Sequence, residues 1–401
     1  MKRFLTRKVF FFLPVFIGLF LYASTIDSTV APIPQKKHLV TRIKKTVVID
    51  NVWVNETLAK MTLKEKIGQF FMVAAYSNKG EEHFKSIDSL IIKNKIGGLI
   101  FFQGQRSNLI PAIKRFQGNS TIPLLVGMDA EWGTEMRLFG EERFPYNYTI
   151  GAANDPELTE RLSSMMGQEC RELGIHINFA PVADVNSNPN NPVIGFRSYG
   201  ENPKDVADHV EACVKGMEKQ SVMTSIKHFP GHGDTDVDSH LDLPIVNNPY
   251  SHIDAIDFFP FRSGIRAGAS SVMIGHLNVP ALDPTGTPSS LSKPTIQQYL
   301  QGELGFSGLV ISDALGMKAV ADRYGKTEVV VMAFEAGCDI LLFPESVSDA
   351  ISAIEKKVIA GKISQKEIDD RCKKVLYAKY KSILHPTKLR TYTKPEIQLA
   401  K

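Results

Sequence analysis

Eight short apolar runs, alternating with longer amphipathic stretches, constrain the fold of this chain more than any other feature. The runs cover residues 69–74, 98–102, 124–129, 177–184, 225–229, 271–276, 309–313 and 339–343. Helix-like stretches between them include residues 156–173, 205–219, 295–304 and 327–336. Strand and helix patterns in alternation are typical of parallel βα units. Eight such units predict an α/β fold: a single-domain (β/α)8 TIM-type barrel, with its active site at the C-terminal ends of the strands.

The same pattern predicts the limits of the domain. We expect the barrel to occupy residues 51–385 and to be closed by a last amphipathic helix over residues 365–383. Residues 386–401 are polar and are expected to form a tail outside the barrel. No stretch remains that could form a second large domain.

The N-terminus has the pattern of an export signal. A basic segment precedes an acid-free apolar run over residues 9–23, and its charges are Lys2, Arg3, Arg7 and Lys8. Such a run is typical of a secretory signal and shorter than the roughly 20 residues of a membrane span, but its cleavage pattern is poor. Residues 1–23 are therefore expected to be an export signal or an uncleaved anchor, and residues 24–50 a tether. This predicts an exported protein, periplasmic or attached to the membrane through that segment alone.

Composition argues against several other classes. The formal net charge is +4 at pH 7, and removing the four N-terminal positive charges leaves a chain near neutrality, without a basic footprint for nucleic acid. No glycine-rich nucleotide motif stands in the right context, so no nucleotide cofactor is expected. The cysteines lack paired spacing and are expected to be buried free thiols; they are Cys170, Cys213, Cys338 and Cys372. No pattern indicates the oligomeric state.

Polar residues end five of the eight apolar runs. They are Asp129, Asp184, His228, His276 and Asp313, on the third to seventh runs in chain order. The carboxyl ends of parallel barrel strands meet at one face, so these side chains are predicted to gather there. One such residue could arise by chance, but five indicate a functional site.

The densest set of proton-transferring groups lies in residues 227–240, which read KHFPGHGDTDVDSH. In extended backbone Asp238 and His240 would share a face, so the carboxylate could hold the imidazole in one tautomer and raise its basicity. A metal-binding loop and a solvated turn are the alternatives. A zinc site would need more regular ligand spacing and a third partner, so no metal is expected.

KHFPGHG followed by DSH resembles the signature of bacterial β-N-acetylhexosaminidases of glycoside hydrolase family 3. Three further segments match in the right order: residues 126–133 (VGMDAEWG), 179–200 (FAPVADVNSNPNNPVIGFRSYG) and 310–317 (VISDALGM). The resemblance covers residues 61–384, most of the chain. It implies a retaining glycosidase that acts on amino-sugar glycans.

The resemblance also implies catalytic roles. Retention requires a nucleophile and a proton donor on either side of the scissile bond. Asp313 matches the nucleophile of the family, although a strand-end aspartate could instead cap the next helix. His240 matches the acid/base and Asp238 its partner; an imidazole suits this role because its pKa of about 6.5 lies near the operating pH.

Substrate-binding positions follow by the same matching, and they are Asp129, Arg137, Arg197, Lys227 and His228. A carboxylate can accept hydrogen bonds from adjacent sugar hydroxyls, while arginine and lysine can donate to them. Surface salt bridges are the alternative for each of these residues.

Other residues near the motifs are expected to be structural. His232 is read as a loop-shaping residue, Glu131 as packing between loops, and His276 as a hydrogen-bonded core histidine. Ala130 and Trp132 replace a glutamine and a glycine found in many relatives, and Trp132 either offers a stacking face or narrows the mouth of the site.

The leading interpretation is an exo-acting, retaining β-N-acetylhexosaminidase that removes terminal N-acetylglucosamine, for example from peptidoglycan fragments. The alternatives are an N-acetyl-β-glucosaminide phosphorylase, a β-glucosidase, against which the histidine motif argues, and a non-catalytic glycan-binding barrel.

Overall fold

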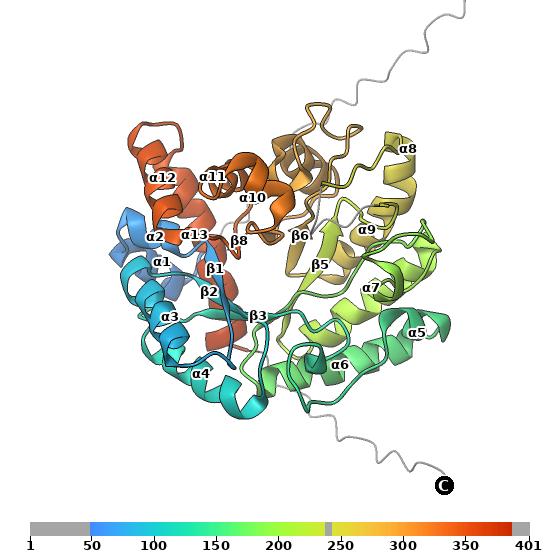
Figure 1. The fold of residues 1–401 in the computed structure, drawn as a ribbon, viewed down its shortest axis with the longest axis horizontal. Helices are drawn as coiled ribbons and strands as arrows, with labels where there is room; N and C mark the ends of the chain where they lie inside the picture. The colour runs from blue at the N-terminus through green and yellow to red at the C-terminus, as the bar shows by residue number, and fades with distance from the viewer. Residues whose placement is uncertain (1–48, 237–242, 387–401) are drawn as a thin grey trace, which may run out of the picture. The chain divides into compact units, whose positions relative to one another are not determined.

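The structure, a computed structural model, describes residues 49–236 and 243–386. Its core is one sheet of eight parallel strands in the order β7-β6-β5-β4-β3-β2-β1-β8, shown in Figure 1. The strands are β1 (Phe71–Ala75), β2 (Gly98–Phe101), β3 (Leu125–Met128), β4 (Ile177–Asn178), β5 (Met223–Phe229), β6 (Ser271–Ile274), β7 (Leu309–Ser312) and β8 (Leu341–Leu342). Each of the eight predicted runs overlaps a strand, which confirms the predicted (β/α)8 barrel.

The sheet closes almost completely. β1 pairs with β2 on one side and with β8 on the other. Between the two ends of the sheet, Ile311 forms an isolated parallel bridge with Ile340, and Ser312 N donates to Ile340 O at 3.0 Å. This contact joins β7 to the residues just before β8.

Helices surround the strands in the outer layer of Figure 1. Those of the first half are α1 (Val52–Lys60), α2 (Leu63–Gly68), α3 (Glu81–Asn94), α4 (Arg106–Gly118), η1 (Thr134–Met136), α5 (Asn147–Ala152), α6 (Pro156–Glu172), η2 (Gly195–Arg197) and α7 (Pro203–Glu218). Those of the second half are α8 (Tyr250–His252), η3 (Ile253–Asp257), α9 (Phe258–Ala267), η4 (Ser289–Leu291), η5 (Pro294–Glu303), α10 (Lys318–Tyr324), α11 (Glu328–Ala336), α12 (Val347–Ile359), α13 (Gln365–Lys379) and η6 (Tyr380–Leu384). None of the helices in the described part of the chain is long and apolar enough to cross a membrane.

Local sequence explains where the main helices begin. Asp155 caps α6 by accepting from Leu158 N, and Pro156 occupies the first turn, where its missing N–H has no consequence. Asn202 and Pro203 repeat this arrangement at α7. The stretch predicted as a helix at residues 295–304 is helical, but it has π-type hydrogen bonding over Pro294–Glu303.

β4 is much shorter than predicted. The apolar run at residues 177–184 suggested a full strand, yet regular pairing covers only Ile177–Asn178. Pro181 has no N–H to donate to the ladder, which interrupts it. Pairing resumes irregularly beyond the proline, where Val182 bridges Lys227 and Ala183 N donates to Lys227 O at 2.6 Å.

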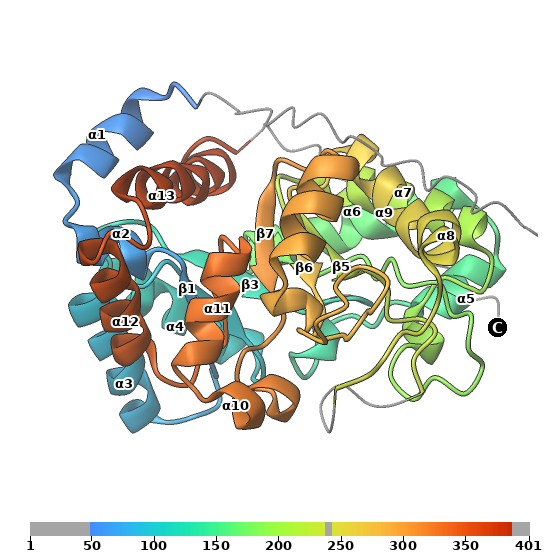
Figure 2. The same cartoon turned by 90° about the horizontal axis from the view of Figure 1, so that it is seen from above.

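The N-terminal end of the barrel is covered by helices. α1 contacts α13, and Trp53 stacks on Tyr380 with ring centroids 6.1 Å apart. Figure 2 shows α1 and α13 together at one end, with α10 at the other. The C-terminal ends of the strands therefore form the face available for a site.

Candidate active site

The residues predicted to bind substrate do meet at the C-terminal face. Asp129 directly follows β3, Lys227 and His228 lie near the end of β5, and Asp313 directly follows β7. Arg137 and Arg197 come from the segments after β3 and β4, at the ends of η1 and η2. The carboxyl ends of β3, β4, β5 and β7 thus deliver these side chains to the same face of the barrel.

Asp129 holds two of the cations. Its Oδ1 lies 2.8 Å from Lys227 Nζ, and its Oδ2 lies 2.8 Å from Arg137 Nη2. Burial alone would raise the pKa of Asp129, but the charges of Lys227 and Arg137 outweigh it and lower the pKa. Asp129 is therefore ionised, with room for a further acceptor contact because 15% of its side chain is exposed.

Glu131 pairs with the remaining cation and also with Lys227. Its Oε1 lies 2.7 Å from both Arg197 Nη2 and Lys227 Nζ, and Arg197 Nε donates to its Oε2 at 3.0 Å. Against the effect of burial, Arg197 and Lys227 hold the pKa of Glu131 well below its usual range. Glu131 therefore lies buried between loops, in line with the expectation, and the structure adds the ion pairs of its carboxylate, which its motif position does not reveal.

These ion pairs are not surface salt bridges. The exposed side-chain fraction is 0% for Glu131, 3% for Lys227 and 17% for Arg197. Burial lowers the pKa of Lys227, yet Asp129 and Glu131 raise it overall, so the ammonium stays charged. The cluster is a fixed array of charged donors and acceptors.

His228 is oriented by Asp184, the residue at the end of the fourth apolar run. His228 Nδ1 lies 2.8 Å from Asp184 Oδ2, and the backbone N–H groups of His228 and His232 donate to the same carboxylate at 2.7–3.2 Å. Despite burial, His228 and His232 lower the pKa of Asp184. Asp184 thus fixes the orientation of the imidazole through Nδ1, and Nε2 lies 3.5 Å from Arg197 Nη2.

Asp313 is half-buried, and it is ionised. Its Oδ1 accepts from Ala314 N at 2.7 Å. Burial raises its pKa, but His276 and His228 lower it below the usual value. The alternative role as a helix cap is excluded, because α10 begins at Lys318 with Met317 at its N-cap.

The two other histidines of this face are buried and hydrogen-bonded within the protein. His276 is fully buried between Ser290 Oγ, 2.6 Å from Nδ1, and Ala314 O, 3.0 Å from Nε2. His232 lies 2.7 Å from Thr235 Oγ1 through Nδ1. Burial and the neighbouring His228 lower the pKa of His232 to about 4, so it is neutral.

Asp238 and His240, the predicted acid/base pair, lie outside the described residues. The four cysteines are buried free thiols, as predicted. In residues 49–236 and 243–386, no group of three or more His, Cys, Asp or Glu side chains could hold a metal ion.

Trp132 packs against other aromatic residues. Its ring meets Tyr146 at 5.0 Å and Phe196 at 5.8 Å between centroids, and it borders a small cluster that includes Phe144 and Met166. Packing against these aromatic residues is therefore one role of Trp132.

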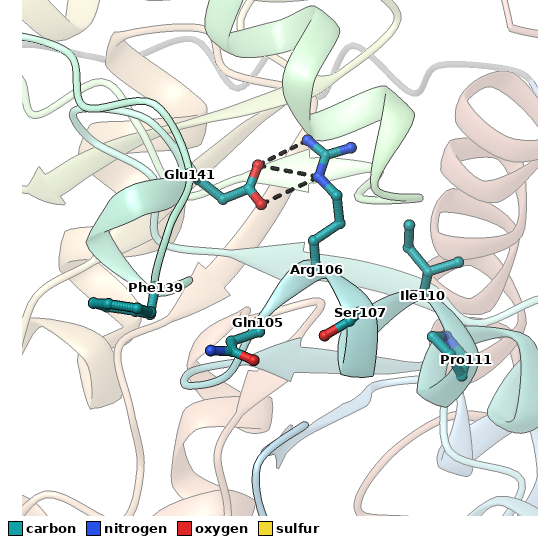
Figure 3. A pocket seen from close by; sticks show the side chains of 7 residues that line it. All are labelled: Gln105, Arg106, Ser107, Ile110, Pro111, Phe139 and Glu141. Atoms are coloured by element: carbon teal, nitrogen blue, oxygen red, sulfur yellow. Dashed lines mark hydrogen bonds and ion pairs between the residues drawn. The ribbon is translucent and has the colours of Figure 1, made fainter.

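A separate, shallow pocket of about 580 Å³ lies beside the start of α4. Figure 3 shows its lining, in which Glu141 takes a two-pronged contact from Arg106, and Phe139 is 81% exposed. None of the predicted site residues lines it.

Fold and cluster together define a class: a (β/α)8 barrel that presents ionised carboxylates, paired cations and an oriented histidine at the C-terminal ends of its strands. The chain belongs to glycosyl hydrolase family 3, since the family description "Glycosyl hydrolase family 3 N terminal domain" matches residues 62–378. This confirms the family predicted from the motifs.

Named relatives agree with this assignment. The chain is 36% identical over 285 residues to "Beta-hexosaminidase A" of Pseudoalteromonas piscicida, covering 65% of this chain and 48% of the relative. It is 34% identical to "Beta-hexosaminidase" of Xylella fastidiosa (strain M12), covering 65% of this chain and 80% of the relative. The chain thus spans about half the length of the first relative and most of the second.

A solved structure gives the same picture. The β-N-acetylglucosaminidase of glycoside hydrolase family 3 from Paenibacillus sp. str. FPU-7 superposes with a TM-score of 0.77 at 35% identity. The match covers 85% of this chain and 66% of that one.

Proposed function

We propose that this protein is a retaining exo-β-N-acetylhexosaminidase that removes terminal β-linked N-acetylglucosamine. The observation that carries the proposal is the ionised, half-buried Asp313 at the same barrel face as the Asp129–Lys227–Arg137 cluster. The printed names of the hexosaminidase relatives support the choice of sugar.

In this proposal Asp313 attacks the anomeric carbon and forms a glycosyl-enzyme. A carboxylate nucleophile must be ionised before attack, and the depressed pKa of Asp313 satisfies this requirement. The proton must then reach the leaving oxygen from another group. His240, oriented by Asp238, is the proposed donor on the basis of the sequence motif.

Sugar hydroxyls would be held by the charged cluster. Asp129 offers acceptor oxygens, while Arg137 and Arg197 offer donors, and each of the three is partly exposed. His228 would add a hydrogen-bonding nitrogen at Nε2, because Asp184 holds the ring in place through Nδ1. Charge-assisted contacts of this kind are about twice as strong as neutral ones and suit a small polar ring.

The experiment monitors hydrolysis of an aryl N-acetyl-β-glucosaminide by NMR, which identifies the anomer of the released sugar. Asp313→Ala is the inactive control. Retention predicts that the β-anomer of the free sugar appears first. Sugar 1-phosphate formed in phosphate buffer would instead identify a phosphorylase. Sugar binding without any turnover would leave a glycan-binding barrel.

A second measurement tests the proton donor. Because acid catalysis matters most for poor leaving groups, His240→Ala should slow cleavage of a disaccharide by about 10²–10⁴-fold while sparing activated aryl glycosides. Asp238→Ala should show the same pattern more weakly. Equal losses on both substrates would contradict this role.

We also propose that the protein is exported and that amino-sugar glycans of the cell wall are its natural substrates. The basic-then-apolar pattern of residues 1–23 supports export. Fractionation of the native host tests it, and recovery of full-length protein in the cytosol would refute it. Release of N-acetylglucosamine from purified peptidoglycan fragments tests the substrate.

A further inference from the structure

The least exposed charged side chains of the cluster are those of Lys227, at 3%, and Glu131. Its side chain is 0% exposed, whereas Asp129, Arg137 and Arg197 expose 15%, 25% and 17% of theirs. A carboxylate with no exposed surface cannot receive a sugar hydroxyl. Any role of Glu131 in the site must therefore act through the residues that it contacts.

Those contacts join three consecutive strand units of the barrel. Glu131 comes from the segment after β3, Arg197 from the segment after β4, and Lys227 from β5 itself. Both carboxylate oxygens are used, Oε1 by Arg197 Nη2 and Lys227 Nζ at 2.7 Å and Oε2 by Arg197 Nε at 3.0 Å. The two cations are therefore held against a single buried anion.

Arg197 depends on this anion more than Lys227 does. Lys227 also contacts Asp129, whereas the ion pairs in the described part of the chain give Arg197 Glu131 alone. Glutamine could not replace the carboxylate, because one of its two prongs would be an NH2 group facing guanidinium donors. The fork between two acceptor oxygens and two guanidinium nitrogens requires Glu131 to remain an anion.

We propose that Glu131 is a positioning residue of the sugar site, which fixes Arg197 and Lys227 in the orientation in which they donate to sugar hydroxyls. The proposal rests on the proposed glycosidase function. It implies that the donor array is already assembled before the sugar binds.

The test compares Glu131→Gln with Glu141→Gln. Glu141 is a matched control because its side chain is only 9% exposed and takes the same kind of fork from Arg106, at 3.1 Å from Nε and 2.7 Å from Nη2. Figure 3 shows that this pair lies in the separate pocket beside α4. The two variants make the same chemical change, one inside the cluster and one outside.

We expect Glu131→Gln to lower kcat/KM by about 10²-fold, the effect of misplacing a binding group by about 1 Å. The loss should be equal on activated aryl glycosides and on disaccharides, since both share the bound sugar, and affinity for N-acetylglucosamine should fall with it. Glu141→Gln should remain within about twofold of wild type in kcat/KM, because its ion pair with Arg106 lies in the separate pocket and contacts none of the proposed sugar-binding residues.

Two further variants separate positioning from a general loss of structure. Glu131→Asp keeps the negative charge on a side chain one methylene shorter. This variant should regain part of the activity lost in Glu131→Gln. Since Arg197 and Glu131 act as a unit, the double variant of Glu131→Gln with Arg197→Met should be no worse than the poorer single variant. Wild-type activity and affinity in both Glu131 variants, or losses matched by Glu141→Gln, would overturn the proposal.

The outcome is separable from that of the proposed function. If the wild type hydrolyses no glycoside, the glycosidase proposal fails, and calorimetric binding of N-acetylglucosamine then decides on Glu131. Unchanged affinity in Glu131→Gln would reject the positioning role in that case as well. If Glu131→Gln does not fold, the same two measurements on Glu131→Asp decide, and wild-type values there reject the proposal.

Discussion

Two buried lysines lie at opposite ends of the same barrel, and their surroundings differ completely. Lys227 lies at the C-terminal end, where its Nζ is 2.8 Å from Asp129 and 2.7 Å from Glu131. Lys379 ends α13 beneath the N-terminal end, where its Nζ donates to the neutral amide oxygen of Gln69 at 2.6 Å. Both side chains are almost wholly withdrawn from water.

Their charge states follow from these partners. Burial lowers the pKa of both amines, but Asp129 and Glu131 more than compensate at Lys227 and raise its pKa. No carboxylate in the described part of the chain does so at Lys379, where burial lowers the pKa from 10.5 to about 7. The buried lysine at the C-terminal end, Lys227, is therefore held in its charged form beside the proposed sugar site. The buried lysine at the N-terminal end, Lys379, loses its proton easily.

The largest effect should come from removing the charge at the C-terminal end. Lys227→Met leaves Asp129 and Glu131 with one cation fewer each, and breaking a buried ion pair from one side costs about 3–5 kcal/mol in the free energy of unfolding. We also expect kcat/KM to fall by about 10²-fold, because the positioned donor is lost. Urea unfolding and steady-state kinetics measure the two losses.

The control is Lys204→Met, which removes an exposed lysine paired with Asp208. This variant should match the wild type in both measurements. If Lys227→Met were as stable as Lys204→Met, the ion pairs at the C-terminal end would not hold the structure together, and the contrast between the ends would fail.

Sequence patterns predicted the location of the C-terminal cluster well. Asp129, His228 and Asp313 stand at the ends of apolar runs, and parallel strands in a barrel bring such ends together. The alternation of runs and helices also gave the fold. Hydrophobic periodicity and a position at the end of an apolar run can be read from neighbouring residues. The fold and the location of the cluster follow from such local patterns.

Contacts between distant segments could not be predicted in this way. The motif position of Glu131 indicates neither its burial nor its fork with Arg197, which depends on how two loops meet. Asp184 ends a run, but only the structure assigns it to His228 Nδ1. Lys379 reads as one of many helical lysines, because a helix pattern does not show which residue faces Gln69.

A smaller effect, of opposite sign, should follow from removing the lysine at the N-terminal end. With a folded pKa of about 7 against an ordinary value of 10.5, a charged Lys379 destabilises the protein by up to about 5 kcal/mol below pH 7. Lys379→Met removes that charge but leaves Gln69 Oε1 without its donor, at a cost of about 1–3 kcal/mol. We expect a net gain of about 2–4 kcal/mol at pH 6, with activity unchanged.

The pH dependence gives the sharper test. Between pH 7 and pH 10.5 the unfolded chain binds the proton that the folded protein has lost, so wild-type stability rises with pH relative to Lys379→Met. The advantage of the variant should disappear as the pH approaches 10.5. A difference that stays constant from pH 6 to pH 10 would mean that Lys379 does not titrate as a buried unpaired amine.

The smallest change in stability should come from giving Lys379, at the N-terminal end of the barrel, a carboxylate partner like those of Lys227. Gln69→Glu places a carboxylate beside Lys379 Nζ, and a buried ion pair of good geometry roughly balances its own desolvation. The substitution also removes the donor that Gln69 Nε2 provides to Lys95 O at 2.7 Å. We expect stability at pH 7 within about 1 kcal/mol of wild type, since the new carboxylate relieves the desolvation penalty of the unpaired Lys379 and this gain offsets the lost hydrogen bond. The rise in stability between pH 7 and pH 10.5 should vanish, because the paired lysine keeps its proton.

Combined with Lys379→Met, the same carboxylate would be buried without a cation and should destabilise the protein by about 3–5 kcal/mol. Additive effects of the two substitutions in urea unfolding would show that residue 69 does not determine the charge of Lys379, and the contrast between the two lysines would then need another cause.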